Sequence, residues 1–402
     1  MNTMATARQV LPARSPVLKK ARVLVLDYTA CGTREPNAAS MYACLRQKYD
    51  MKIIALPCAP HVRLLAALRS FHPQNSKWSR RYWQILEGYQ HSPKGYRQTT
   101  DAYARATAGS HAEVVLQFGA LFGPIPTRGA RGYLTYHDGN MAITSRSPSH
   151  QAQYMNAEQL AEWLQLERSL VRGASRVLTY SRRTRDSYIH DYGCDETQVV
   201  AVGSSNWVKL ADREWVDGLL GQDLDTLNRR RDGRKILFVY TDFERKGGPA
   251  LLQAFENLLV DLPHAQLIAV GPHPELARGR NVESRGMIRD RAELFKLYRE
   301  ASVFVLPSLN DPFPRVIFEA MAHGLPCIGT RVGGIPEQII NGKTGIVIEP
   351  GVVEPLTAAL RRLLENEDER RALGCAGREH LAANFMPESV AARVAEQIEQ
   401  VC

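Results

Sequence analysis

The chain has 402 residues, a net charge of +9 and 44% hydrophobic residues, which is typical of a globular protein with two domains rather than one. No apolar run approaches the roughly 20 residues that span a bilayer, and residues 1–20 lack the continuous apolar segment of a secretory signal. We interpret residues 1–20 as a flexible basic arm. The seven cysteines are scattered and form no CxxC pair, which favours free thiols and a cytoplasmic location.

Charge is distributed unevenly along the chain. Residues 1–210 carry 27 Lys and Arg against 14 Asp and Glu, whereas the remaining residues carry 24 against 28. A basic first half indicates an anionic partner, such as the inner face of a membrane or an acidic lipid or saccharide, but a generally basic, solvated surface explains the same count. Both interpretations stay open. No motif for reading nucleic acid is present, so nucleic acid is not expected as a partner.

Short apolar runs alternate with amphipathic stretches through residues 21–205, which predicts an α/β domain. Strands are expected at residues 21–28, 51–57, 112–118, 132–139, 174–181 and 198–203. Gly32 and Thr33 lie in the turn after the first of these strands, and His137 lies at the end of the fourth. Ligands bind at such strand ends in open α/β sheets, so His137 is a candidate site residue, with a purely structural role as the alternative.

Two segments depart from the alternation. Residues 61–110 are rich in aromatic and basic side chains, which indicates either a surface that faces a membrane or an acceptor, or an amphipathic helical cover. Residues 206–234 are polar and end in RRRDGR, so we expect the hinge between the domains there. Asp223 and Asp225 form a DxD in this hinge, for which solvated carboxylates are expected rather than a metal site.

The strand and helix pattern restarts at residue 235 and predicts a second doubly wound domain over residues 235–385. Strands are expected at residues 235–240, 265–272, 301–308, 325–330 and 344–351. Residues 386–402 form a final helix, for which packing back on the first domain is one option. The fold class is therefore α/β, with two Rossmann-like parallel-sheet domains facing across a cleft.

An anion site is predicted where residues 235–240 turn into the next helix. Arg245 and Lys246 precede Gly247 and Gly248, which lack Cβ atoms, and Pro249 suits the first helical turn. The N–H groups of a helix N-terminus with two fixed cations beside them suit a phosphate group. The segment is not a Walker loop, because GxxxxGK[ST] is absent, and exposed cations at an ordinary turn are the alternative.

Two carboxylates stand eight positions apart in the segment DPFPRVIFEAMAHGLPCIGTRVGGIPE of residues 311–337. Asp311 lies just before a predicted helix and Glu319 lies on it, and helix capping by Asp311 is the structural alternative for the first acid. Candidate substrate contacts between the two acids are Phe313, Pro314 and Arg315. The paired glycines of VGGIP let backbone amides approach a ligand.

Together these motifs resemble the large group of retaining, GT-B-fold glycosyltransferases that use nucleotide sugars. The resemblance is carried by FVYTDFERKGGPALLQAF, LIAVGP, the paired acids and GGIPEQIINGKTGIVIEPG, in the family's order, and more weakly by ERSLVRGASRVLTYSRRTRDSY. It implies an acceptor domain over residues 21–205 and a donor domain over residues 235–385. The implied reaction moves a sugar from a nucleoside-diphosphate sugar to a hydroxyl of a saccharide or lipid-linked acceptor, without a metal or another cofactor.

The resemblance also implies roles for single residues. Lys246 matches the family's diphosphate-binding lysine, Glu319 the acid that holds the ribose hydroxyls, and His137 the active-site histidine near the donor sugar. Asp311 stands where the family has a glutamate that faces the sugar hydroxyls. The family's arginine is missing, because Tyr240 and Thr241 stand there, and Arg245 is a candidate replacement.

The Gly32–Thr33 turn is a candidate acceptor contact. Two alternatives to transfer stay open: a nucleotide-sugar epimerase or phosphorylase on the same scaffold, or a catalytically degenerate protein that binds a nucleotide sugar. The missing arginine and the glutamate-to-aspartate change favour the second of these. A dinucleotide oxidoreductase is disfavoured, since neither first-strand turn presents GxGxxG.

Overall fold

The computed structural model describes residues 20–28, 38–56, 60–73, 75–146, 155–224, 231–272, 275 and 277–402. The first domain is built on a parallel sheet with the strand order β2-β1-β3-β4-β5-β6. Its strands are β1 (Arg22–Tyr28), β2 (Asp50–Leu56), β3 (Val114–Phe118), β4 (Gly132–His137), β5 (Arg176–Thr179) and β6 (Val199–Ala201). Because every neighbouring pair is parallel, the carboxyl ends of all these strands meet at one edge.

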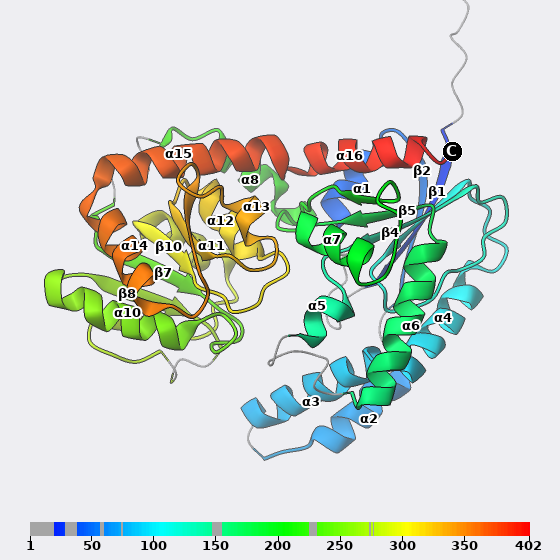
Figure 1. Ribbon diagram of the computed structural model, residues 1–402, viewed down its shortest axis with the longest axis horizontal. Coiled ribbons are helices and arrows are strands. Elements are labelled where there is room, and N and C mark those ends of the chain that lie inside the picture. Colours follow the sequence, from blue (N-terminus) through cyan, green and yellow to red (C-terminus); the bar gives the residue numbers. More distant parts are fainter. Residues whose placement is uncertain are drawn as a thin grey trace, which may run out of the picture.

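Helices surround this sheet, and some of them form an extension (Figure 1). The helices of the first domain are α1 (Ala39–Leu45), α2 (Pro60–Ser70), α3 (Asn75–Gln90), α4 (Pro93–Thr107), α5 (Met141–Ser145), α6 (Ala157–Gly173) and α7 (Arg182–His190). The aromatic and basic stretch of residues 61–110 thus forms three successive helices. Of these, α2 and α3 pack on each other at the lower end of the first domain in Figure 1.

The second domain has the strand order β12-β11-β10-β7-β8-β9, again with parallel pairs throughout. Its strands are β7 (Lys235–Val239), β8 (Gln266–Val270), β9 (Val282–Ser284), β10 (Val303–Leu306), β11 (Cys327–Thr330) and β12 (Gly345–Ile348). The order reverses between β7 and β10, which is the point where open α/β sheets bind ligands. The predicted pair of Rossmann-like domains is therefore confirmed, although β9 was not expected.

The helices of the second domain complete a layered structure around this sheet (Figure 1). They are α10 (Gly248–Asp261), α11 (Arg291–Glu300), α12 (Arg315–Ala322), α13 (Ile335–Gln338), α14 (Val353–Glu365) and α15 (Glu367–Asn384). All four residues of β10 are fully buried, as expected for a central strand that is covered on both faces. The core thus fixes the strand ends from which the site is built.

The connection between the domains is more ordered than its polar composition indicates. It contains η2 (Leu210–Asp212) and α8 (Arg213–Leu220), and Val216 and Leu219 of α8 are buried. The ring of Trp215 stacks on that of Phe295 in the second domain, with centroids 3.7 Å apart. Asp225 of the DxD lies outside the described residues, whereas Asp223 lies within them.

The last helix, α16 (Pro387–Glu399), returns to the first domain and packs against α1 (Figure 1). Tyr49 Oη donates to the carbonyl of Ala395 at 3.2 Å. The chain therefore crosses between the domains twice. The two crossings touch, because Trp207 Nε1 of the first donates to the carbonyl of Phe385 in the second at 3.0 Å. None of the helices in the described part of the chain has the length and hydropathy of a membrane span.

Candidate active site

A cavity of about 410 Å³ lies between the two domains, where the carboxyl edges of their sheets face each other. The first domain contributes the residues that follow β3 and β4, among them His137 and Asp138, and the second contributes Arg245, Asp311 and Pro312. The domains also meet beside it, since the backbone N–H of Arg182 donates to Glu337 Oε1 at 2.6 Å. Three of the candidate catalytic residues are thus brought together in one cavity.

A buried ion pair forms one wall of the site. Lys246 Nζ bonds to Asp311 Oδ2, and the two residues are only 8% and 5% exposed. Burial lowers the pKa of the Lys246 ammonium, and the adjacent Asp311 carboxylate opposes that shift. Lys246, to which the resemblance assigns the diphosphate, is therefore paired with Asp311, to which the resemblance assigns the sugar hydroxyls.

Gly247 lets the backbone turn from Lys246 into α10. Its φ is 78°, and a Cβ at this position would lie 1.9 Å from the carbonyl oxygen of Pro307. At Gly248, a Cβ would lie 2.3 Å from the ring of Phe243. Only glycine allows this close approach of two strand-end loops, and the 14-residue helix α10 therefore starts two positions after Lys246.

Arg245 lines the cavity and is anchored by the loop that follows β10. Its Nη1 donates to the carbonyl of Asn310 at 2.8 Å, and its Nε lies 3.7 Å from Asp242 Oδ2. The guanidinium therefore lies in the same cavity as Asp311. Arg245 thus places a second cation directly before Lys246, although the family's arginine is absent, and its role toward an anionic group stays a prediction.

His137 ends β4 and is 1% exposed. Its Nε2 is buried and has no hydrogen-bond partner among the described residues, while the ring packs 5.0 Å from the ring of Tyr188. Burial lowers the pKa of His137 to about 3, so the imidazole is neutral at pH 7. A neutral ring nitrogen in a polar cavity is suited to a ligand hydroxyl and does not supply positive charge.

Glu319 lies apart from this cavity. Its Oε2 accepts from Tyr298 Oη at 3.0 Å, and its Oε1 lies 3.7 Å from Arg291 Nη2. Arg291 in turn lies 2.9 Å from a carboxylate oxygen of Asp212, in the connection between the domains. Burial raises the pKa of Glu319, and the charge of Arg291 opposes that rise. The paired acids of the sequence thus occupy two different environments.

The residues between the paired acids serve mainly to pack the structure. The ring of Phe313 is buried and lies 5.7 Å from that of Tyr180 in the first domain. Pro314 precedes α12, and its carbonyl accepts from Gln338 Nε2 at 2.9 Å. Arg315 is exposed on α12. The two predicted acceptor contacts, Gly32 and Thr33, lie outside the described residues.

Glu167 is a cavity residue that sequence reasoning missed. It is buried on α6, where its carboxylate accepts from the backbone N–H of Met141 at 3.1 Å and from the hydroxyls of Tyr188 and Tyr192. His91 and Trp163 line the same part of the cavity. A signal was present in the sequence, because Glu167 falls in the helical stripe of Trp163 and Leu170, where an apolar residue is expected.

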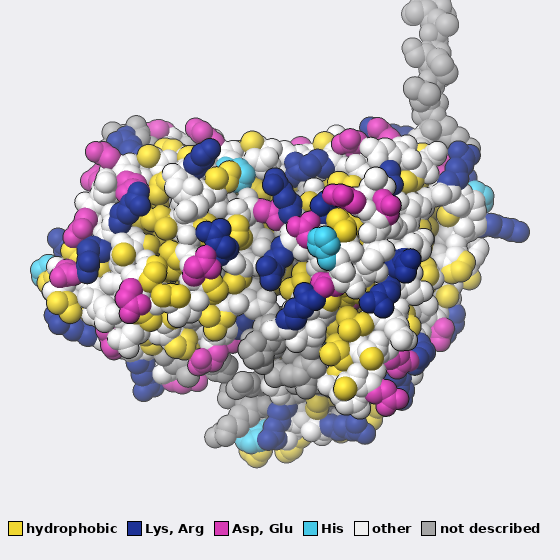
Figure 2. Space-filling view, in the orientation of Figure 1, with side chains coloured by type: hydrophobic (Ala, Val, Ile, Leu, Met, Phe, Trp, Pro, Cys, Tyr) yellow, Lys and Arg dark blue, Asp and Glu magenta, His cyan; other side chains and the backbone are white. Residues whose placement is uncertain are grey.

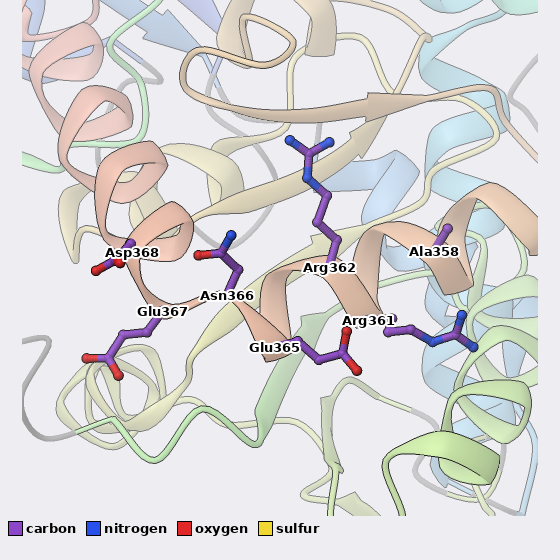
Figure 3. A pocket seen from close by; sticks show the side chains of 7 residues that line it. All are labelled: Ala358, Arg361, Arg362, Glu365, Asn366, Glu367 and Asp368. Carbon is purple, nitrogen blue, oxygen red and sulfur yellow. The ribbon is translucent and has the colours of Figure 1, made fainter.

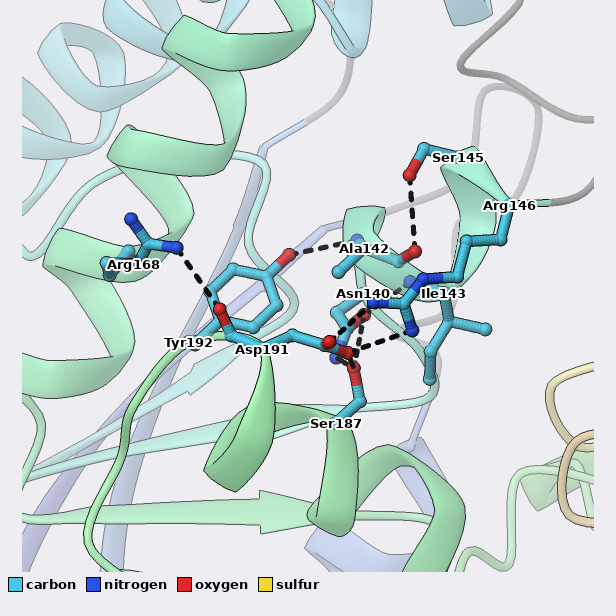
Figure 4. Close-up of polar contacts among 9 residues, drawn as sticks. All are labelled: Asn140, Ala142, Ile143, Ser145, Arg146, Arg168, Ser187, Asp191 and Tyr192. Carbon is cyan, nitrogen blue, oxygen red and sulfur yellow. Dashed lines mark hydrogen bonds and ion pairs between the residues drawn. The ribbon is translucent and has the colours of Figure 1, made fainter.

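A polar network holds the turn that follows His137 (Figure 4). Asn140 caps α5 by accepting from the N–H of Ile143 at 2.9 Å, and its Nδ2 donates to Ser187 Oγ at 3.1 Å. Tyr192 Oη accepts from the N–H of Ala142 at 3.1 Å. Since Tyr192 also donates to Glu167, the buried acid and the network together fix the end of β4.

The stability of the protein should depend on Glu167 and pH. Burial raises the pKa of Glu167 from 4.5 to about 7, so the folded state keeps a proton that the unfolded state has lost between those values. Stability is therefore lost as pH rises through this window. We expect the free energy of unfolding of the wild type, relative to Glu167→Gln, to fall by about 3 kcal/mol from pH 4.5 to 7. Urea unfolding of both proteins at several pH values measures this difference. If the free energies of unfolding of the wild type and Glu167→Gln changed in parallel with pH, the prediction would be contradicted.

Another hollow lies away from the strand edges, where α14 passes into α15 (Figure 3). Two of its side chains, Arg361 and Arg362, form ion pairs with Asp261 and Glu369. These are exposed pairs of the kind that surface helices carry, and they offer no nucleophile or neutral donor. In the part of the chain that the structure describes, no group of three or more His, Cys, Asp and Glu side chains is placed to hold a metal ion.

Comparison with known proteins bears on the second domain most directly. Residues 233–366 match the model of the family described as Glycosyl transferases group 1. Most of the second domain is thus similar to the glycosyl transferases of group 1. N-acetyl-alpha-D-glucosaminyl L-malate synthase of Bacillus anthracis is 32% identical over 167 residues, which are 40% of this chain and 44% of that protein. The match thus spans less than half of that relative's length.

The whole chain is similar in fold to solved glycosyltransferases. Sucrose-phosphate synthase of Thermosynechococcus elongatus has a TM-score of 0.65 at 19% identity, over 95% of this chain and 99% of that one. Anabaena Alr3699/HepE, solved in complex with UDP-glucose, has a TM-score of 0.57 at 13% identity, over 94% and 100% of the two chains. These likenesses confirm the predicted GT-B fold.

Proposed function

We propose that this protein transfers a sugar from a nucleoside-diphosphate sugar to a hydroxyl of a saccharide or lipid-linked acceptor, with retention of configuration. The observation that carries the proposal is the cavity where both sheet edges meet, with the unpartnered His137 Nε2 in it and Asp311, paired with Lys246, in its wall. The match to the group 1 family and the UDP-glucose complex of HepE support a nucleotide sugar as the donor.

The donor diphosphate would bind at the start of α10. Lys246 and Arg245 offer positive charge directly before the N-terminus of α10, whose helix dipole adds to it. As the acceptor oxygen bonds to the anomeric carbon, the bond from that carbon to the diphosphate oxygen breaks, and the proton of the acceptor hydroxyl passes to the departing diphosphate. The charge that develops on the leaving oxygens is stabilised by these groups without a metal, which is the largest effect that the site supplies.

The sugar itself would lie between Asp311 and His137. Asp311 accepts from sugar hydroxyls once Lys246 turns to the phosphate, and the neutral His137 accepts or donates one bond. The acceptor would enter on the side of His91, Trp163 and Glu167, all from the first domain. The two domains thus bring the reacting groups together, and closure of the cleft orients them.

Glu319 is proposed to hold the ribose hydroxyls, as the resemblance implies. We expect Glu319→Gln to weaken binding of the nucleoside diphosphate about 10- to 100-fold, because hydrogen bonds to a charged acceptor contribute about 1.5–3 kcal/mol. Calorimetric titration with the nucleoside diphosphate measures the change. Glu349→Gln, at an exposed acid that pairs with Arg331, is the matched control. An unchanged dissociation constant for Glu319→Gln would remove the ribose assignment.

A screen of nucleotide sugars tests the whole proposal. We expect one or a few of them to raise the melting temperature of the protein, and radiolabelled sugar from these to be transferred to saccharide or lipid-linked acceptors. Stabilisation without any transfer or hydrolysis would favour a nucleotide-sugar-binding protein instead. We place the reaction in the cytoplasm, since free thiols suit a reducing compartment and the described cysteines Cys44, Cys194, Cys327, Cys375 and Cys402 are all free.

A further inference from the structure

The two helices α2 and α3 expose a concentrated apolar face. On α2 and directly after it, the side chains of Leu64, Leu65, Leu68 and Phe71 are 50–70% exposed and follow the spacing of one helical face. The other face of α2 is the packed one, where Val62 and Ala66 meet Leu86 of α3 in a small separate core. Of the twelve large hydrophobic side chains that are exposed in the described part of the chain, these two helices carry five, and Phe71, directly after α2, is a sixth.

Aromatic rings extend this face onto α3. The ring of Trp78 lies 6.2 Å from that of Phe71, and its Nε1 points to the carbonyl of Ala67 at 3.4 Å. Trp83 is also exposed on α3, but it lies about 140° around the helix from Trp78 and is not part of this face. Tryptophan has an apolar body and a polar edge, so it is favoured where hydrocarbon meets water.

The charge of this segment is strongly one-sided. Residues 60–90 contain five basic residues and one acid, Glu87, and the basic residues are Arg63, Arg69, Lys77, Arg80 and Arg81. Arg63, Arg69 and Arg81 are exposed around the apolar face. Figure 2 shows hydrophobic and basic side chains together at this lower end of the molecule. An apolar helical face flanked by Lys and Arg suits an anionic lipid surface.

We propose that α2 and α3 dock this protein on a membrane that contains anionic lipids, with Leu64, Leu68 and Phe71 entering the headgroup region. A second copy of the chain is a poorer occupant of this face, because pairing it with itself would bring two segments of charge +4 together. The lipid surface neutralises that charge instead. The docking surface would be the α2–α3 pair as a unit, since its own small core holds the two helices together.

The helices α2 and α3 lie next to the cavity between the domains. His91 directly follows α3 and lines the cavity, with its ring 5.7 Å from that of Trp163. A lipid-linked acceptor whose anchor stays in the membrane under α2 and α3 would therefore reach the site from the His91 side. This part of the inference rests on the proposed function, whereas the docking of the helices on lipid does not.

Vesicle co-sedimentation of the full chain tests the docking. We expect the wild type to bind vesicles of phosphatidylcholine with phosphatidylglycerol, to release as salt rises, and to bind vesicles of pure phosphatidylcholine far less. The double variant Leu68→Ser/Phe71→Ser should lower the partition coefficient about tenfold or more, because it removes two exposed apolar side chains that the lipid would bury. Val260→Ser, at an exposed apolar residue of α10, is the control and should bind as the wild type does.

A second variant keeps the test independent of how Leu68 and Phe71 affect folding. Arg69→Glu/Arg81→Glu should abolish the preference for phosphatidylglycerol and leave vesicle-free donor hydrolysis unchanged. Equal sedimentation of both double variants and the wild type would overturn the proposal, as would a wild type that does not bind. A dimer in light scattering that Leu68→Ser/Phe71→Ser dissociates would assign the face to a second copy. Vesicle binding without any nucleotide-sugar binding would leave the docking intact and overturn only the proposed function.

Discussion

Replacing Lys246 with methionine is expected to remove most of the sugar transfer and to lower the free energy of unfolding by about 3–5 kcal/mol. The stability effect arises because Asp311, only 5% exposed, is left in the protein without its charged partner. The activity effect arises because the diphosphate loses the cation that stabilises its departure. Urea unfolding and a transfer assay at saturating donor measure the two effects separately.

The double variant Lys246→Met/Asp311→Asn separates the two causes. It removes both charges with little change in shape, so it should recover most of the stability but none of the activity. Arg331→Met is the control for a surface pair, since Arg331 and Glu349 are more than half exposed, and it should cost less than about 1 kcal/mol. A Lys246→Met protein as active as the wild type would remove the phosphate assignment. A double variant no more stable than the single one would contradict the ion-pair explanation.

Replacing Gly247 with alanine is expected to destabilise the protein by about 3 kcal/mol and to abolish donor binding. The cost combines a side chain in the left-handed region, about 1–2 kcal/mol, with a Cβ that would overlap the carbonyl oxygen of Pro307. The loop must move to relieve the overlap, and the N–H groups at the start of α10 move with it. Urea unfolding and nucleotide titration measure both consequences.

Gly193→Ala is the matched control for this substitution. Gly193 has a similar φ of 70°, but no atom lies within 4 Å of the position that its Cβ would take. It should therefore cost about 1 kcal/mol and leave donor binding unchanged. If the two alanine variants were equally stable and bound nucleotide equally, the close approach at Gly247 would not matter to the site.

The fold was largely predictable, because its central strands are short continuous apolar runs that alternate with amphipathic helices. The strand β10 is such a run, with every residue buried. The edge strand β9 was missed because the sequence of Val282–Ser284, VES, is short and mostly polar, so only its neighbour β8 defines it. The connection at residues 206–220 was also hard to foresee, since its helix is stabilised by distant contacts such as Trp215 with Phe295.

The candidate site was predictable where it depends on strand ends alone. His137, Arg245 and Asp311 each follow a strand, and parallel sheets bring such positions to one edge. Glu167 was not predictable in this way, because it lies in the middle of a helix and its inward direction depends on how α6 packs. The packing role of Phe313 depends on a contact across two domains, with Tyr180, which no local pattern encodes.

The two crossings between the domains limit how the cleft can open. If the two connecting segments lay far apart, opening the cleft would stretch one segment or slide one domain along the other. They instead touch through Trp207 and the carbonyl of Phe385, and Arg393 of α16 holds the carbonyl of Val202 at 2.8 Å. The lowest-cost motion is therefore a rotation of two rigid bodies about a single axis through this contact. Along such an arc Asp311 and His137 separate and return together, so the geometry of the closed site is recovered at each turnover.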